Sequence, residues 1–173
     1  MPKIRPADLP KPSHDVWEEA ARSFEEGSKA RKTIAFHKAR THNCAQAVLC
    51  SFADEIGMDE EDLYKLSEGL SVGIAANKRV CGALLAADLV LSYFTSDPDL
   101  DHWSTPETNE AVNALHQDFM EQLAALLGED RSSIICKEII HDDMPLDVPC
   151  TFVMGAAAQA AQRAIETGWG MSG

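Results

Sequence analysis

The chain has 173 residues, 45% of them hydrophobic and 25% charged, which is typical of one globular domain with a sizeable core. Its 28 acidic and 15 basic residues give a net charge of −13. This charge argues against a nucleic-acid surface, because phosphate binding requires clustered Lys and Arg. No apolar run has the length of a signal-peptide core or a membrane span, so we expect a cytoplasmic protein without membrane insertion.

The five cysteines are an odd number in a chain that is long enough to fold without a disulfide framework. A reducing compartment would keep them as thiols at rest. They therefore need another explanation, either as small buried hydrophobic residues or as groups that carry chemistry.

The first segments predict a short lead-in followed by two helices. Residues 1–12 contain four prolines and are expected to be extended or disordered, with a single helical domain over residues 13–173. Residues 13–27 place Trp17, Ala20 and Phe24 at helical spacing and end at Gly27. Residues 28–40 continue with helix-forming residues around Ile34 and Phe36.

Residues 43–57 predict one helix that starts at Asn43 and ends at Gly57. Its apolar stripe consists of Ala45, Val48, Leu49, Phe52 and Ile56. At about 100° per residue, Cys44 lies at the edge of this stripe and faces the interior. Cys50 points to the polar side, so we expect it to be a surface thiol.

The middle of the chain predicts three more helices. Residues 58–70 form a short one with acidic residues in its first turn, and a looser stretch follows over residues 71–78. Residues 79–94, which contain Cys81 and Asp88, are apolar around nearly the whole circumference and predict a central, buried helix. Residues 104–128 predict an amphipathic helix.

The C-terminal part contains one ambiguous segment and one clear helix. Residues 132–143 are rich in β-branched residues, but we predict a helix because no partner strand is evident. Residues 147–168 predict a helix with Pro149 near its start and Cys150 beside it. We therefore expect an all-α fold, a compact bundle-like domain of about six or seven helices.

Three cysteines, Cys44, Cys81 and Cys150, lie at or near predicted helix N-termini, where the helix dipole favours a thiolate. Neighbouring residues act in the same direction, since Lys78 and Arg79 precede Cys81 and His42 precedes Cys44. Cys136 has Lys137 beside it but no clear helix start. We predict that Cys81 is the most reactive thiolate.

Other residues have a functional and a structural interpretation. Asp88 follows Cys81 by seven residues on the same helical face, where it could orient a ligand or simply satisfy a buried donor. His116 and His141 could bind a metal or be ordinary surface groups. The small residues of the segment MGAAAQAA, residues 154–161, could form a homodimer contact or pack within the chain. No C-x-x-C, H-E-x-x-H or glycine-rich phosphate loop is present.

Four short segments, NCAQAVL, CGALLA, IICKEII and VPCTFV, occur in this order and each contains one cysteine. Over residues 36–164 the chain resembles a bacterial and archaeal family of redox-active proteins named for its motif C…GCAxxG…C…C. By this motif the four characteristic cysteines are Cys44, Cys81, Cys136 and Cys150, and Cys50 has no counterpart. Ala86 stands where the motif has its second glycine.

The resemblance implies a small helical domain with a redox role, and three functions stay open. In the first, the four cysteines converge on one site for thiol–disulfide or electron-transfer chemistry with a redox partner or small-molecule substrate. In the second, the same four thiolates bind an iron–sulfur cluster or another metal. In the third, the cysteines are inert and the protein is a structural or interaction module.

Overall fold

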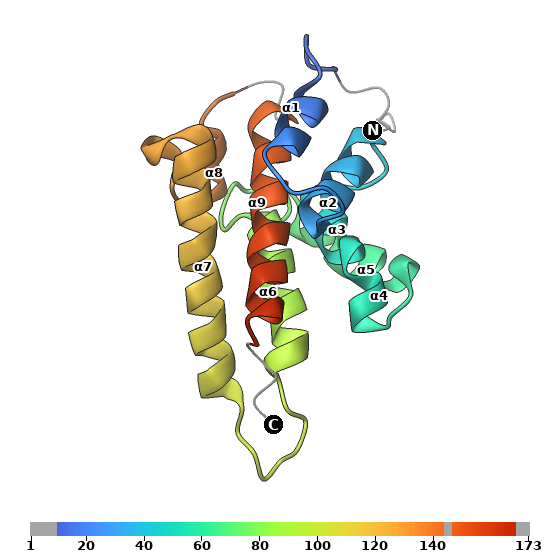
Figure 1. Ribbon diagram of the computed structural model, residues 1–173, viewed down its shortest axis with the longest axis vertical. Coiled ribbons are helices and arrows are strands. Elements are labelled where there is room, and N and C mark those ends of the chain that lie inside the picture. The colour runs from blue at the N-terminus through green and yellow to red at the C-terminus, as the bar shows by residue number, and fades with distance from the viewer. Residues whose placement is uncertain (1–9, 144–146, 169–173) are drawn as a thin grey trace.

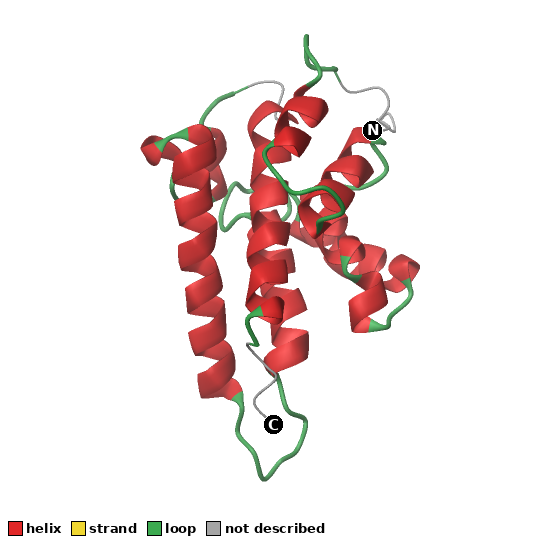
Figure 2. Ribbon diagram, viewed as in Figure 1, coloured by secondary structure: helices red, strands yellow, loops and turns green. Residues whose placement is uncertain are grey.

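The computed structural model describes residues 10–143 and 147–168, and within these ranges the chain forms nine α-helices and no strand (Figures 1 and 2). The predicted all-α fold is confirmed. Residues 1–9 of the predicted lead-in, residues 1–12, lie outside the described residues, and Pro10, Lys11 and Pro12 belong to no helix.

Three long helices run alongside one another and carry much of the core (Figure 1). They are α6 (Gly82–Thr95), α7 (Thr105–Leu127) and α9 (Asp147–Glu166), and each packs against the other two. The buried face of α9 consists mainly of Ala and Gly, and small side chains allow close approach of the neighbouring helices. The sequence prediction of a central, buried α6 agrees with this arrangement.

Five shorter helices lie on the other side of α9, and the first three of them pack directly against it. They are α1 (Val16–Arg22), α2 (Lys29–Lys38), α3 (Cys44–Ser51), α4 (Ala53–Ile56) and α5 (Glu60–Ser67). The helix α2 packs against both α9 and α3, and α5 packs against α3. As predicted, α3 begins behind Asn43, whose side chain accepts hydrogen bonds from the N–H groups of Ala45 and Gln46.

The segment of residues 43–57 is not one continuous helix, as we had predicted from its apolar stripe. The helical conformation is interrupted at Phe52, which has φ −103° and ψ 13°, and the chain continues as α4. Just before the break, the Ser51 hydroxyl donates a hydrogen bond to the Val48 carbonyl at 2.7 Å. Such bonds from Ser to a backbone carbonyl of the preceding turn favour bending of a helix.

The prediction that Cys50 is a surface thiol is wrong, because its side chain is fully buried. The face of α3 that carries Cys50 is covered by α5, and the Cys50 thiol lies 3.6 Å from the carbonyl oxygen of Glu60 at the start of that helix. The helical phase was correct, but the phase of one helix does not reveal that a second helix covers its polar side.

Residues 132–143 contain both an extended and a helical part. An isolated antiparallel bridge joins Val80 to Ile135, and the helix α8 (Cys136–Ile140) starts directly after it. The Cys81 N–H donates to the Ile134 carbonyl at 2.8 Å, and the Cys136 N–H donates to the Arg79 carbonyl at 2.6 Å. The bridge therefore holds the start of α8 beside the start of α6.

The loop between the 3-10 helix η2 (Glu68–Leu70) and α6 is left-handed. Its residues with positive φ include Val72, Gly73, Ile74, Ala75, Ala76 and Lys78. A left-handed conformation costs a residue with a side chain about 1–2 kcal/mol, so this loop is held by its surroundings. Gly73 is required for space as well, because a Cβ atom there would lie 2.4 Å from the Arg79 nitrogen.

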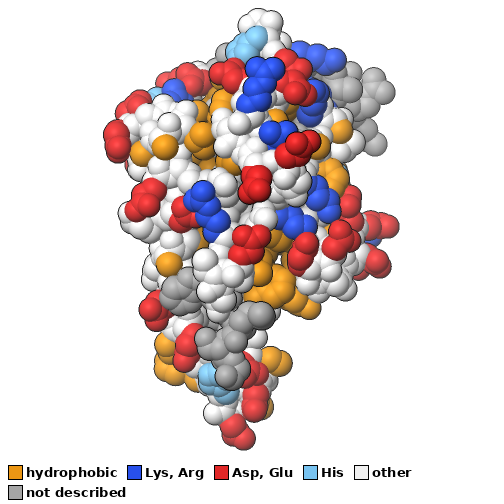
Figure 3. Space-filling model, viewed as in Figure 1, with side chains coloured by type: hydrophobic (Ala, Val, Ile, Leu, Met, Phe, Trp, Pro, Cys, Tyr) orange, Lys and Arg blue, Asp and Glu red, His pale blue; other side chains and the backbone are white. Residues whose placement is uncertain are grey.

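The visible surface is consistent with the acidic composition. Figure 3 shows acidic side chains over much of one face, with Lys and Arg interspersed among them. Within the described part of the chain, no helix combines the length and hydropathy that crossing a membrane would require.

The burial of Cys50 predicts that its thiol is unreactive in the folded protein. Burial raises the pKa of Cys50 to about 11, with a smaller contribution from the Glu60 carboxylate. We expect iodoacetamide at pH 8 to leave Cys50 unmodified until urea unfolds the protein, whereas the partly exposed Cys44 serves as an internal control. Fragmentation of the peptide that carries both residues measures this; equal labelling of both in the folded state would contradict it.

Candidate functional site

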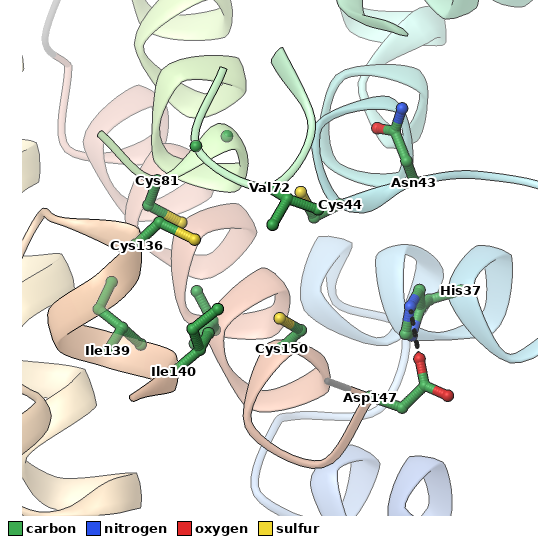
Figure 4. Close-up of a pocket in the computed structure, with 13 residues that line it drawn as sticks. His37, Asn43, Cys44, Val72, Cys81, Cys136, Ile139, Ile140, Asp147 and Cys150 are labelled. Carbon is green, nitrogen blue, oxygen red and sulfur yellow. Dashed lines mark ion pairs between the residues drawn. The ribbon is translucent and has the colours of Figure 1, made fainter. Parts of the chain in front are cut away.

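One cavity of about 200 Å³ is lined by all four motif cysteines (Figure 4). Cys81 and Cys136 are buried, and Cys44 and Cys150 are partly exposed. All five cysteines of the chain are free thiols, and Cys50 does not line the cavity. The fold thus brings together the four positions selected by the motif, whereas their chemical roles stay predictions.

Each of the four cysteines lies at the start of a different helix. Cys44 is the first residue of α3, Cys81 is the N-cap of α6, Cys136 is the first residue of α8, and Cys150 is the fourth residue of α9. The sequence indicated three of these starts. It did not indicate the start at Cys136, because no side-chain cap precedes α8 and the bridge to Val80 is not a local feature.

Gly82 allows the starts of α3 and α6 to meet. A Cβ atom at this position would lie 2.2 Å from the Leu70 carbonyl oxygen and 3.3 Å from the Cys44 sulfur. No side chain fits at the first of these distances. The glycine in the C-G-A triplet therefore lets the Leu70 backbone and the Cys44 thiol pack directly against α6.

Cys44 is the cavity thiol whose thiolate the surrounding backbone favours most. Burial raises the pKa of Cys44, but four backbone N–H groups lower it, those of Val72, Ala45, Cys44 itself and Ala83. A negative charge on Cys44 raises the pKa of each of the other three thiols. We therefore expect Cys44 to ionise before the other three thiols of the cavity.

The expectation that Cys81 has a lowered pKa is wrong. Burial, followed by the charge on Cys44, raises the pKa of Cys81 to about 12, which outweighs the N–H groups at the start of α6. Neither of the two cations expected to assist Cys81, Lys78 and Arg79, is among the main causes of its shift. Lys78 instead lowers the pKa of Cys136, although burial still raises that pKa to about 11. Desolvation of a thiolate is the larger effect at both positions.

Cys150 is the fourth thiol of the cavity. Burial raises the pKa of Cys150 well above its ordinary value, and the charges on the other cavity cysteines and on Asp147 act in the same direction. Several thiolates close together repel one another, so the cavity holds at most a small number of them at neutral pH.

Of the predicted supporting residues, His42 and Asp88 do not line the cavity. The His42 ring packs between Phe36 and Tyr64, with centroid distances of 4.2 and 5.1 Å. The Asp88 carboxylate lies 3.0 Å from the His116 ring nitrogen, between α6 and α7.

Three predicted candidates remain, Lys78, Arg79 and His141. The first two help to hold the start of α8 through their backbone carbonyls. Arg79 is exposed, and its carbonyl holds the start of α8. Lys78 also accepts a hydrogen bond from Lys137 through its carbonyl, at 3.2 Å. His141 ends α8 with a positive φ of 50° and does not line the cysteine cavity.

Two residues that the sequence reasoning missed, His37 and Asp147, line the same cavity (Figure 4). The His37 Nε2 atom lies 3.3 Å from Asp147 Oδ1, and Arg40 Nη2 lies 2.8 Å from Asp147 Oδ2. Asp147 precedes Cys150 by one turn of α9, a spacing that could have indicated it. Nothing in the sequence relates His37 to these residues, because α2 is distant in the chain.

The residues present do not form a ready metal site. Four cysteines are the common ligand set of iron–sulfur clusters. Within residues 10–143 and 147–168, however, no group of three or more His, Cys, Asp or Glu side chains is arranged to hold a metal ion.

The fold and the cavity define an all-α protein in which four cysteines, each at a helix start, converge on one site. A family model described as "Putative redox-active protein (C_GCAxxG_C_C)" matches residues 42–164, and the chain belongs to this family. The resemblance seen in the sequence is thereby confirmed. No curated protein and no solved structure matches the chain.

The contact at Gly82 predicts a selective effect of a single methyl group. Gly82→Ala is expected to lower the free energy of unfolding by about 1–3 kcal/mol, because the new Cβ atom overlaps the Leu70 carbonyl. The matched control is Gly69→Ala, since a Cβ atom at Gly69 meets no atom within 4 Å. Urea unfolding of both variants measures the difference, and equal stability would contradict the role of Gly82.

The raised thiol pKa values predict a loss of stability at alkaline pH. Thiols of the unfolded chain ionise near 8.5, whereas the pKa of Cys81 is raised to about 12 and that of Cys136 to about 11. Between these values the folded state retains protons that the unfolded state loses, so the free energy of unfolding falls as the pH rises above about 9.

Cys81→Ala removes one of these contributions and should make the fall shallower. Urea unfolding in reducing buffer at pH 8, 9 and 10 tests this. The parent protein is the reference, because the variant and the parent contain the same Lys and Tyr residues, which also titrate in this range. The same pH dependence in both proteins would show that Cys81 does not remain protonated in the folded state.

Proposed function

We propose that the protein is a thiol-dependent oxidoreductase in which Cys44 and Cys81 cycle between a dithiol and a disulfide. The observation that carries this proposal is the position of Cys44 among the four cavity thiols. Its thiolate is the one that the backbone favours, and its charge raises the pKa of each of the other three. A thiolate is the attacking species in thiol–disulfide exchange.

Cys81 is the proposed second cysteine because it shares the start of α6 with the Cys44 sulfur. The Ala83 N–H lowers the pKa of both thiols, so both sulfur atoms lie near this one group. The Cys44 sulfur also lies against Gly82, the residue directly after Cys81. Among the charges that raise the pKa of Cys81, that of Cys44 has the largest effect.

The reaction consumes a disulfide-bearing substrate. The Cys44 thiolate attacks one substrate sulfur, a mixed disulfide forms, and the first substrate thiol leaves. Cys81 then attacks the Cys44 sulfur, the second substrate thiol leaves, and the Cys44–Cys81 disulfide remains. One substrate disulfide is reduced to two thiols while two protein thiols are oxidised to one disulfide. A reduced dithiol partner in a cytoplasmic, reducing compartment would restore the protein.

Mapping of the disulfide tests the proposal. We expect reduced protein treated with bis(2-hydroxyethyl) disulfide, then quenched with acid and digested, to contain a Cys44–Cys81 link. Cys44→Ser should lower the rate of oxidation by at least about tenfold, whereas the control Cys50→Ala should not change it. Oxidation of the Cys44 variant at the parent rate would refute the assignment.

The other two functions predict different results. Metal analysis after anaerobic purification should find less than one metal ion per chain under the dithiol proposal, and a stoichiometric iron content would favour the cluster instead. Inert structural cysteines would leave all four cavity thiols unoxidised in the folded protein.

A further inference from the structure

The cysteine cavity has a polar end formed by His37 and Asp147, which Figure 4 shows to one side of the four thiols. Among the described residues that line this cavity, these two are the only titratable groups other than the cysteines. Asp147 uses both carboxylate oxygens, one with His37 and one with Arg40. The carboxylate is therefore held in place by a cation and orients the imidazole ring.

The hydrogen bonds of His37 select one tautomer. The Trp17 indole N–H donates to His37 Nδ1 at 3.3 Å, and an indole nitrogen can only donate. Nδ1 therefore carries no hydrogen, and the ring hydrogen is on Nε2, facing Asp147 Oδ1. The ring is neutral, with a basic nitrogen at Nδ1.

The surroundings of His37 favour this neutral form at physiological pH. Burial lowers the pKa of His37 below 6.5, Arg40 acts in the same direction, and the Asp147 carboxylate opposes them. The titratable, charged or hydrogen-bonding groups around the ring and in its cavity come from α1, the starts of α3, α6 and α8, α9 and the residues just after α2. They are Trp17, Arg40, Asn43, Cys44, Cys81, Cys136, Asp147, Cys150 and Thr151. On the solvent side, Lys38 pairs with Asp15 and Glu18.

We propose that His37 accepts the proton of Cys44 when this thiol reacts with a disulfide, and that Asp147 and Trp17 are positioning residues for the ring. The inference rests on the thiol–disulfide function proposed above. The Cys44 proton passes to Nδ1 of His37, which lines the same cavity, and the Thr151 hydroxyl oxygen, 3.4 Å from Nδ1, accepts the new N–H in place of the Trp17 donor.

The proton balance of the reaction is complete with this acceptor. His37 takes one proton as Cys44 becomes a thiolate, and the departing substrate thiolate takes that proton back from the imidazolium. In the second half, Cys81 gives its proton through His37 to the second substrate thiolate. Burial opposes a lone thiolate and a lone imidazolium alike, but the two charges stabilise each other when they form together.

The inference extends the site beyond the family match. That match begins at residue 42, so both His37 and Trp17 precede it. The helices α1 and α2 would then supply the proton-transfer residue for cysteines that belong to the matched region.

The test measures the oxidation rate of Cys44 in the full, reduced chain by bis(2-hydroxyethyl) disulfide between pH 5 and 8. This probe is neutral, so its own charge does not affect the profile. We expect the parent protein to show an inflection below pH 6.5, where His37 becomes neutral. His37→Gln should abolish the inflection and lower the rate at pH 7.5 by about a hundredfold.

A second variant keeps the histidine and changes only its hydrogen bond. Trp17→Phe removes the donor to Nδ1, which destabilises the neutral ring, so the inflection should move to higher pH. The matched control is His116→Gln, because His116 also pairs with an aspartate, Asp88 at 3.0 Å, but lies outside the cavity. This control should keep the parent profile.

The outcomes separate the inference from the function on which it rests. If the Cys44–Cys81 disulfide forms and His37→Gln keeps the parent rate and pH profile, the role of His37 is wrong. An unshifted inflection in Trp17→Phe would also overturn it, even if His37→Gln failed to fold. If Cys44 forms no disulfide in the parent protein, the proposed function itself fails.

Discussion

The packing of the Leu70 carbonyl group directly on Gly82 is the contact on which the cysteine cavity depends. The contact requires a residue without a Cβ atom at the start of α6. It also joins the two ends of the left-handed loop, which contains several residues with side chains. With this contact in place, the Cys44 sulfur reaches the first turn of α6 and shares the Ala83 N–H with Cys81. The bridge between Val80 and Ile135 then adds the start of α8 to the same site.

Two opposing effects act on every thiol in this cavity. A helix start offers N–H groups that favour a thiolate, whereas burial removes the water that would stabilise its charge. At Cys81 burial is the larger effect, and the pKa rises to about 12. At Cys44 four N–H groups act against burial, and the residue as a whole is only partly buried. The number of donors around a sulfur therefore distinguishes the thiols better than the helix start they have in common.

The N-terminal helices are part of the site although the family match does not include them. The helix α2 packs between α3 and α9 and places His37 on the cavity, while α1 supplies the Trp17 donor. Asp147 on α9 links these helices to the matched region through His37 and Arg40. The polar end of the cavity is thus assembled from segments about 110 residues apart, in the same way as the sulfur-lined end.

The sequence alone determined the all-α class, the start of α3 at its Asn43 cap and the four cysteine positions, because helical periodicity, capping residues and a motif are local features. It could not determine that Cys50 is buried, since α5 covers that face of α3 only in the folded chain. Nor could it determine the order of the thiol pKa values, which depends on desolvation and on donors such as the Val72 N–H. His37 was missed for the same reason: its partners Trp17 and Asp147 are 20 and 110 residues away in the chain, and only tertiary packing brings them together.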